Sequence, residues 1–94
     1  MKTWLVLLVS EAEEELGEAP LSIQRKFDQW VLLVQGYGPW LKGGWRTEAL
    51  RGVLKGFYSV RLNQKWRAIF EIRPERNIVV IRIVAHDYKS VRRR

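Results

Sequence analysis

The chain has 94 residues, of which 47% are hydrophobic and 29% charged, a balance that predicts one folded domain over 1–94. It has no cysteine and one histidine, which excludes a disulfide framework and a thiolate zinc site, and we expect neither a metal nor any other cofactor. The apolar run at 4–9 is too short to span a bilayer and has no signal-peptide cleavage pattern, so we expect a cytoplasmic protein without membrane contact.

The formal net charge of +7 is divided unevenly along the chain. Residues 1–41 carry three lysines and arginines against six acids, a net −3, whereas residues 42–94 carry fourteen against four, a net +10. A charge that served solubility alone would be spread more evenly. The division therefore predicts that the C-terminal half binds a polyanion, for which RNA is the leading candidate. A basic surface without a ligand is the alternative.

A strand and a short helix are predicted at the start of the chain. The run 3–9 (TWLVLLV) is apolar at both alternate sets of positions, as in a strand buried on both faces. Ser10 followed by Glu13 has the form of a capping box, and the acids after Ser10 favour a helix N-terminus. We expect this helix to end near Gly17.

A second helix starts at Pro20 or Ser22 and ends at Gly36. Its core-facing stripe, at helical spacing, consists of Ile23, Phe27, Trp30, Val31 and Val34. The glycine-rich segment 37–56 has no clear period, and a helical turn is predicted within 47–54. Three apolar side chains of that turn are expected to pack on the core: Leu50, Val53 and Leu54.

Three strands are predicted at 57–62, 65–72 and 77–86. One alternate set in each strand is apolar and should face the helices: Tyr58, Val60 and Leu62; Trp66, Ala68, Phe70 and Ile72; Val79, Ile81, Ile83 and Ala85. Every ionisable residue of the strands falls on the opposite set. The predicted fold is α+β, with an N-terminal strand, two helices and then a three-stranded antiparallel meander, the helices packed on one face of the sheet.

The first hairpin of the meander is predicted to oppose two arginines. Opposed residues point to the same face, so a two-residue turn at 63–64 is excluded because it would set Arg61 against Trp66. A connection at 63–65 sets Arg61 against Arg67, with Cβ atoms about 5 Å apart. These like charges repel, and no acid is predicted at a neighbouring position. The pair suits a phosphate group, because arginine offers forked donors that match phosphate oxygens.

The second hairpin is predicted to bring further cations to this pair. A four-residue loop at 74–77 sets Arg73 against Ile78 and puts proline where a type I turn favours it. Carried along the ladder, this register gives three further matches: Arg67 with Val84, Ile69 with Arg82, and Lys65 with His86. Arg82 then lies close to the arginine pair, and an ion pair with Glu71 is the alternative for it.

His86 is the candidate proton-transfer group in this cluster. Neighbouring cations favour the neutral imidazole, which can accept a proton. An ordinary surface histidine at a strand end is the alternative. The final residues 92–94 are all arginine and are most simply a solvated basic tail that contacts phosphates non-specifically.

The order of elements and the basic open face together resemble the RelE/ParE superfamily of bacterial type II toxins. The residues that carry the resemblance are LKGFYSVRLNQKWRAIFEI at 54–72 and IVVIRIVAHDYK at 78–89. Its most specific part is the pattern that runs from Arg61-Leu62 through Trp66-Arg67 to Phe70.

The resemblance implies an endoribonuclease that cleaves mRNA on the ribosome, as in the RelE and HigB branches, by attack of a ribose 2′-hydroxyl on the adjacent phosphate. It assigns phosphorane stabilisation to Arg67, phosphate binding to Arg61 and a proton transfer to His86, with Tyr88 or Lys65 for the other proton. The residues expected to contact RNA are Lys55, Lys65, Arg82 and Lys89. The resemblance also implies a cognate antitoxin protein and a toxin–antitoxin hetero-oligomer.

Two other functions are compatible with the same surface. The ParE branch shares the fold and inhibits DNA gyrase, and a catalytically inactive relative would be a binding protein alone. Retention of Arg61, Arg67 and His86 favours the nuclease branch. A non-enzymatic RNA-binding domain is less favoured, because base stacking on a sheet needs exposed aromatic residues that the middle of these strands lacks.

Overall fold

The computed structural model describes residues 3–85. Their elements, in chain order, are β1 (Leu5–Leu8), α1 (Ser10–Glu18), α2 (Leu21–Tyr37), β2 (Glu48–Ala49), the 3₁₀ turn η1 (Gly52–Leu54), β3 (Tyr58–Arg61), β4 (Trp66–Arg73) and β5 (Asn77–Ala85). Within this range the strands form one sheet in the order β1-β5-β4-β3-β2, in which β1 runs parallel to β5 and the other pairs are antiparallel. The predicted α+β fold is confirmed, and β2 is an addition to it.

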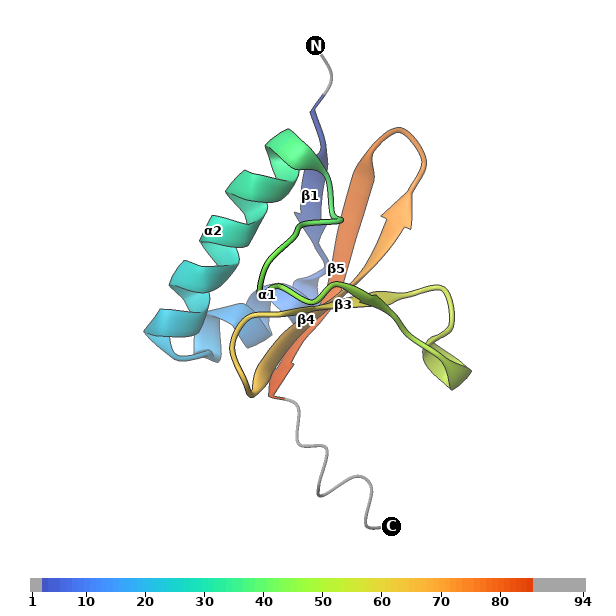
Figure 1. The fold of residues 1–94 in the computed structure, drawn as a ribbon. Coiled ribbons are helices and arrows are strands. Elements are labelled where there is room, and N and C mark those ends of the chain that lie inside the picture. Colours follow the sequence, from blue (N-terminus) through green and yellow to red (C-terminus); the bar gives the residue numbers. More distant parts are fainter. Residues whose placement is uncertain (1–2, 86–94) are drawn as a thin grey trace.

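The helices pack on one side of the sheet, and α2 lies across that face (Figure 1). In the range 3–85 neither helix has the length and apolar character that crossing a bilayer requires. α1 starts without the predicted capping box, because Ser10 is already helical and no side chain caps the first turn. Val9 is the N-cap residue instead, and its carbonyl accepts the N–H of Glu13 at 3.0 Å.

α2 begins after Pro20 and ends where Gly38 turns the chain. Pro20 is the N-cap residue, and its carbonyl accepts the N–H groups of Ile23 at 2.9 Å and Gln24 at 3.1 Å, which are the first hydrogen bonds of the helix. Gly38 has φ +86°, and a Cβ atom there would lie 3.1 Å from Nε1 of Trp4. Both the backbone conformation and the close indole ring therefore require glycine at this position.

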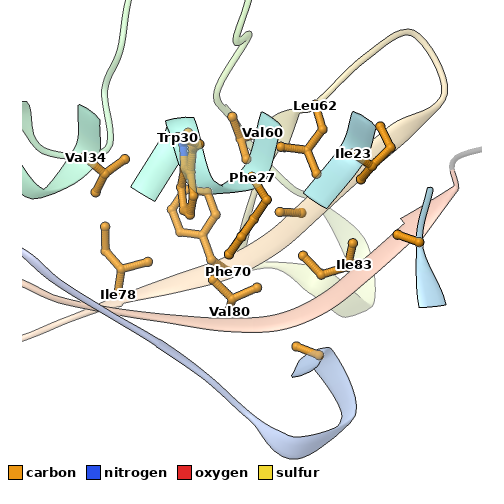
Figure 2. Close-up of a cluster of buried hydrophobic side chains, with 13 residues drawn as sticks. Ile23, Phe27, Trp30, Val34, Val60, Leu62, Phe70, Ile78, Val80 and Ile83 are labelled. Atoms are coloured by element: carbon orange, nitrogen blue, oxygen red, sulfur yellow. The ribbon is translucent and has the colours of Figure 1, made fainter. Parts of the chain in front are cut away.

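The core lies between α2 and the sheet. Figure 2 shows the α2 side chains of the predicted stripe directed toward side chains of the strands; the buried members of the cluster include Ile23, Phe27, Trp30 and Val34 from α2, and Val60, Phe70, Ile78, Val80 and Ile83 from the sheet. At its centre the Trp30 ring lies 5.5 Å from Phe27 and 5.3 Å from Phe70. The predicted stripe is confirmed, with Val31 only partly buried at its margin.

β1 lies at the edge of the sheet and has only one covered face, so the prediction of a strand buried on both faces is wrong. Leu5 and Leu7 are 49% and 48% exposed, while Val6 and Leu8 pack against the core. The helices cover the face that holds Val6 and Leu8, and the opposite face is open. Apolar residues at both alternate sets therefore do not indicate two buried faces here.

The segment between β2 and β3 projects from the sheet instead of packing on the core (Figure 1). The predicted helical turn is the 3₁₀ turn η1. Val53 is 99% exposed and Leu54 is 36% exposed, so their predicted burial is wrong, and Leu50 is only half-buried.

The register of the β3–β4 hairpin is the predicted one. Arg61 pairs with Arg67, and Val60 pairs with Ala68. Asn63 shapes the connection, because its side-chain oxygen accepts the backbone N–H groups of Lys65 and Trp66, both at 2.8 Å. The two arginines therefore lie side by side on the face that the helices leave uncovered.

The predicted β4–β5 register is confirmed near the arginines and is wrong near the hairpin. Arg73 pairs with Asn77 rather than with Ile78, so the connection is one residue shorter than predicted. The extra residue appears further along as a β-bulge at Ile81, because Ile69 pairs with Arg82 while Phe70 pairs with Val80. The bulge restores the predicted pairing of Arg67 with Val84. In the part of β5 that precedes the bulge, each side chain points to the face opposite to the predicted one, so that Ile78 and Val80 are buried in place of the predicted Val79 and Ile81.

Candidate functional site

The uncovered face of the sheet contains a small polar hollow of about 190 Å³, lined by Arg46, Glu48, Ser59, Arg61 and Arg67. We call it the arginine hollow. Its composition follows from the register, because Glu48 pairs with Ser59 and Arg61 pairs with Arg67, and opposed residues share a face. Three adjacent strands thus contribute polar side chains to one place.

Arg67 is held rigidly in this hollow. Its side chain is buried, with the residue 8% exposed, and its Nη1 donates to the carbonyls of Asn63 at 2.9 Å and Trp66 at 3.2 Å. A longer contact of 3.5 Å reaches the carbonyl of Gln64. A guanidinium has five N–H donors, so three remain outside the Nη1 group. The connection between β3 and β4 therefore fixes the guanidinium in advance of any ligand.

Arg61 has a buried donor without an acceptor. Its backbone N–H donates to the carbonyl of Trp45 at 2.7 Å, which ties the segment before β2 to the edge of β3. Its side-chain Nε is buried and has no hydrogen-bond partner within residues 3–85. A buried donor left unpaired costs roughly 1–3 kcal/mol, so the fold holds Arg61 in this position at a cost. The donors that Arg61 can offer to a ligand are those of Nη1 and Nη2.

Glu48 is a site residue that the sequence did not predict. Its strand has two residues, too few to show an alternating pattern, yet its pairing with Ser59 brings the carboxylate to the arginine hollow. The expectation that the arginine pair has no neighbouring acid is therefore wrong. Within residues 3–85 Glu48 forms no ion pair closer than 4.0 Å, so the carboxylate lies near the arginines without being bound to them.

Arg82 is bound to acids of α1. Its Nη2 lies 2.8 Å from the Glu15 carboxylate and its Nε donates to the same group at 2.9 Å, while Glu11 lies 3.7 Å away. The alternative pairing with Glu71 is wrong, since Glu71 pairs with Arg73 at 3.3 Å. The charge of Arg82 is thus compensated within the protein.

Glu15 also completes the edge of the sheet. β1 pairs with β5 only as far as Val80, and beyond that point the Glu15 carboxylate accepts the N–H of Ile83 at 2.7 Å. Partial burial alone would raise the pKa of Glu15, but the hydrogen bonds from Arg82 and Ile83 and the Arg82 charge more than offset this and leave the pKa lowered. The hydrogen bond between Arg82 and Glu15 also raises the pKa of Arg82.

The predicted lysines lie at opposite ends of β3. Lys65 is exposed in the connection that joins Arg61 to Trp66, so it neighbours the arginine hollow. Lys55 is exposed in the projecting segment at the other end of β3. The remaining predicted site residues, His86, Tyr88 and Lys89, lie outside the described residues. In the described part of the chain no group of His, Cys, Asp and Glu is arranged to hold a metal ion.

The fold is that of the RelE/YoeB-type toxins. The toxin–antitoxin complex RelBE2 from Mycobacterium tuberculosis has a chain that superposes with a TM-score of 0.72 at 19% identity, covering 92% of this chain and 94% of that one. The archaeal RelE–RelB complex from Pyrococcus horikoshii OT3 gives 0.73 at 20% identity, covering 88% and 94%.

A YoeB/ParE toxin from Agrobacterium tumefaciens gives a TM-score of 0.73 at 16% identity, covering 93% of this chain and 100% of that one. No protein-family model and no curated protein matches the sequence. The fold that the sequence resemblance implies is thus confirmed.

Proposed function

We propose that this chain is the toxin of a type II toxin–antitoxin pair and that it is an endoribonuclease whose active site is the arginine hollow. The observation that carries the proposal is the opposition of Arg61 to Arg67 beside the carboxylate of Glu48, on the sheet face that the helices leave open. Solved structures that share the fold are described as toxins, which supports the toxin assignment.

The hollow holds groups suited to RNA cleavage by the neighbouring ribose hydroxyl. In that reaction the 2′-oxygen forms a bond to phosphorus and the bond to the 5′-oxygen breaks, which yields a cyclic phosphate and a free 5′-hydroxyl. Glu48 accepts the proton of the 2′-hydroxyl. The fixed donors of Arg67 stabilise the charge on the phosphorane, and Arg61 binds a non-bridging oxygen through its Nη1 and Nη2 groups.

Protonation of the leaving 5′-oxygen falls to the C-terminal residues. His86 follows Ala85, which pairs with Trp66 and so neighbours Arg67 in the sheet register. We assign the proton donation to His86, with Tyr88 as the other candidate, and contacts to the flanking RNA phosphates to Lys65 and Lys89. The substrate is mRNA on the ribosome.

The test is cleavage by substituted proteins. We expect Glu48→Gln and Arg61→Ala each to lower the rate of mRNA cleavage in a translating extract by about 10²- to 10³-fold, as for removal of one proton-transfer or charge-stabilising group. Arg73→Ala is the matched control, because Arg73 is an exposed cation at the far end of β4. Cleavage that survives both hollow substitutions at the rate of the control would overturn the proposed site.

A binding function is the second candidate, in the manner of a gyrase inhibitor or an inactive toxin relative. The observation that favours it is that the side chains of Arg67 and Arg82 both donate hydrogen bonds to groups of the protein itself, which leaves fewer donors for a substrate. Induction of the protein would then produce DNA-damage signalling and no new RNA ends.

The partner of the proposed toxin is a cognate antitoxin in a hetero-oligomer. The structures that share the fold include toxin–antitoxin complexes, among them RelE–RelB from Pyrococcus horikoshii OT3 and YoeB–YefM from Staphylococcus aureus. An antitoxin segment that carries acids would complement the arginine hollow. Co-purification of the chain with the product of an adjacent small gene tests this assignment, and a chain that stays alone at micromolar concentration contradicts it.

A further inference from the structure

A second hollow lies beside the arginine hollow, at the edge of β3. It measures about 370 Å³, and its lining includes Lys26 of α2, Trp45 and Arg61. Trp45 is half-buried and packs against the core on one side. We call this space the Trp45 hollow. Its volume lies in the range of cavities that hold small organic ligands.

Arg61 joins the two hollows, because it lines both of them. A ligand that occupies both hollows would therefore contact Arg61. The Nε of Arg61 is itself buried, so such a ligand would be bound by the remaining guanidinium donors, those of Nη1 and Nη2.

The backbone before β2 is bent in a way that serves both hollows. Arg46 has φ +49°, a left-handed conformation that is uncommon for a residue with a side chain. Trp45 lines one hollow and Arg46 lines the other, so the bend sends consecutive side chains to the two sites. The N–H of Arg61 holds the bend in place through the Trp45 carbonyl, at 2.7 Å.

The chemistry of the Trp45 hollow matches a nucleotide. The Nζ of Lys26 lies 4.7 Å from the Trp45 ring centroid, so a face of the indole is covered by the end of an exposed, extended side chain. A nucleobase can take that place over the ring, since every base has an apolar face that stacks on tryptophan. The displaced ammonium group and Arg61 then bind the phosphate of the same nucleotide.

We propose that the Trp45 hollow binds one unpaired RNA nucleotide adjacent to the scissile phosphate, with its base stacked on Trp45 and its phosphate between Lys26 and Arg61. This inference rests on the proposed function and adds to it a binding position outside the reacting groups. Stacking does not depend on the identity of the base, so the position contributes affinity and register more than sequence preference.

Binding of a short RNA that cannot be cleaved tests the inference. The probe is a fluorescent trinucleotide with 2′-O-methyl groups, and its partner lacks one terminal base. We expect Trp45→Leu to weaken binding of the intact probe by roughly 5- to 150-fold, as for the loss of one base stack, and Trp45→Phe to weaken it by less than about threefold. Removal of the base should cost the wild type as much as Trp45→Leu does, and should cost the Trp45→Leu protein almost nothing.

Two further variants keep the test decisive. Lys26→Gln changes an exposed side chain that leaves the core intact, and we expect it to weaken binding of the intact probe by at least about threefold and to reduce the salt dependence of binding. Arg73→Ala, which changes an exposed cation at the far end of β4, should bind the probe like the wild type. Unfolding midpoints of all variants identify any loss that comes from misfolding.

The inference is overturned if Trp45→Leu, folded, binds the intact probe as tightly as the wild type, or if base removal costs both proteins the same. It is also overturned if the wild type fails to bind the RNA probe but binds an acidic peptide, which would make the hollow a protein-docking site. If Trp45-dependent RNA binding occurs without any cleavage, the nucleotide position stands and the proposed ribonuclease activity fails.

Discussion

Glu15→Ala is expected to detach α1 from the end of β5. The substitution removes the contacts of the Glu15 carboxylate with Arg82, at 2.8 and 2.9 Å, and with the N–H of Ile83, at 2.7 Å. The side chains of Glu15 and Arg82 are 22% and 44% exposed, so solvent screens the ion pair and its share is only about 0.5–1 kcal/mol.

The larger share comes from Ile83. Its N–H loses its acceptor at a partly buried edge of the sheet, which costs roughly 1–3 kcal/mol, toward the low end because water can reach the vacated site. The sum is about 2 kcal/mol, which corresponds to a melting temperature lower by roughly 8–16 °C for a domain of this size. Glu15→Gln keeps an acceptor for Ile83 and should cost about 0.5–1 kcal/mol.

The pH dependence of this loss has a definite sign. The pKa of Glu15 is lowered in the folded protein, so the carboxylate stabilises the fold fully above its ordinary pKa, about 4.3 for glutamate. As pH falls below that value and through the lowered pKa, Glu15 is protonated and the part of the stabilisation that depends on its charge is lost. The difference in unfolding free energy between wild type and Glu15→Ala should therefore be constant above about pH 5 and shrink below about pH 4.

Urea unfolding monitored by tryptophan fluorescence measures these differences. Glu14→Ala is the control, because Glu14 is an exposed acid one residue away on the same helix. If Glu15→Ala unfolds at the same urea concentration as Glu14→Ala, or if its deficit is as large at about pH 3 as at neutral pH, the assigned contacts do not hold α1 to β5.

Three further substitutions follow from the structure, and each can be measured by thermal or urea unfolding. Arg67→Ala should lower the unfolding free energy by about 1–3 kcal/mol, because the carbonyls that Arg67 binds lose a buried donor; no change would mean that these hydrogen bonds are absent in solution. Gly38→Ala should cost at least about 1 kcal/mol through its positive φ and the contact with Trp4, and a stable variant would contradict that geometry. Val53→Asp should change stability by less than about 0.5 kcal/mol, and a larger loss would show that Val53 is buried.

Much of the fold was predictable because the hydrophobic residues of the strands and of α2 recur at the spacing typical of a strand and of a helix. The parity of β3 and β4 gave the Arg61–Arg67 pairing, since a two-residue turn would mix the faces and the common three-residue connection does not. The bulge at Ile81 could not be predicted, because a shorter turn plus one extra residue leaves the same register at Arg67. The exposure of Leu5 was missed because a strand with one open face can be as apolar as a strand that is buried on both faces.

The candidate site was predictable only in part. The arginine pair depends on local hairpin geometry, which the sequence specifies. Glu48 was missed because a two-residue strand has no period, and its pairing with Ser59 depends on the path of the preceding loop. The binding of Arg82 by Glu15 joins residues 67 positions apart and requires the packing of α1 on β5. Contacts of this kind arise from tertiary structure and leave no local pattern.

The most direct test of the central claim is a map of RNA 5′ ends after brief expression of the chain without an antitoxin. The account predicts new 5′-hydroxyl ends within translated mRNA for the wild type and for Arg73→Ala, and a loss of these ends by about 10²-fold or more for Glu48→Gln. Growth arrest of the wild type without any new 5′-hydroxyl ends would contradict the claim that the arginine hollow cleaves RNA.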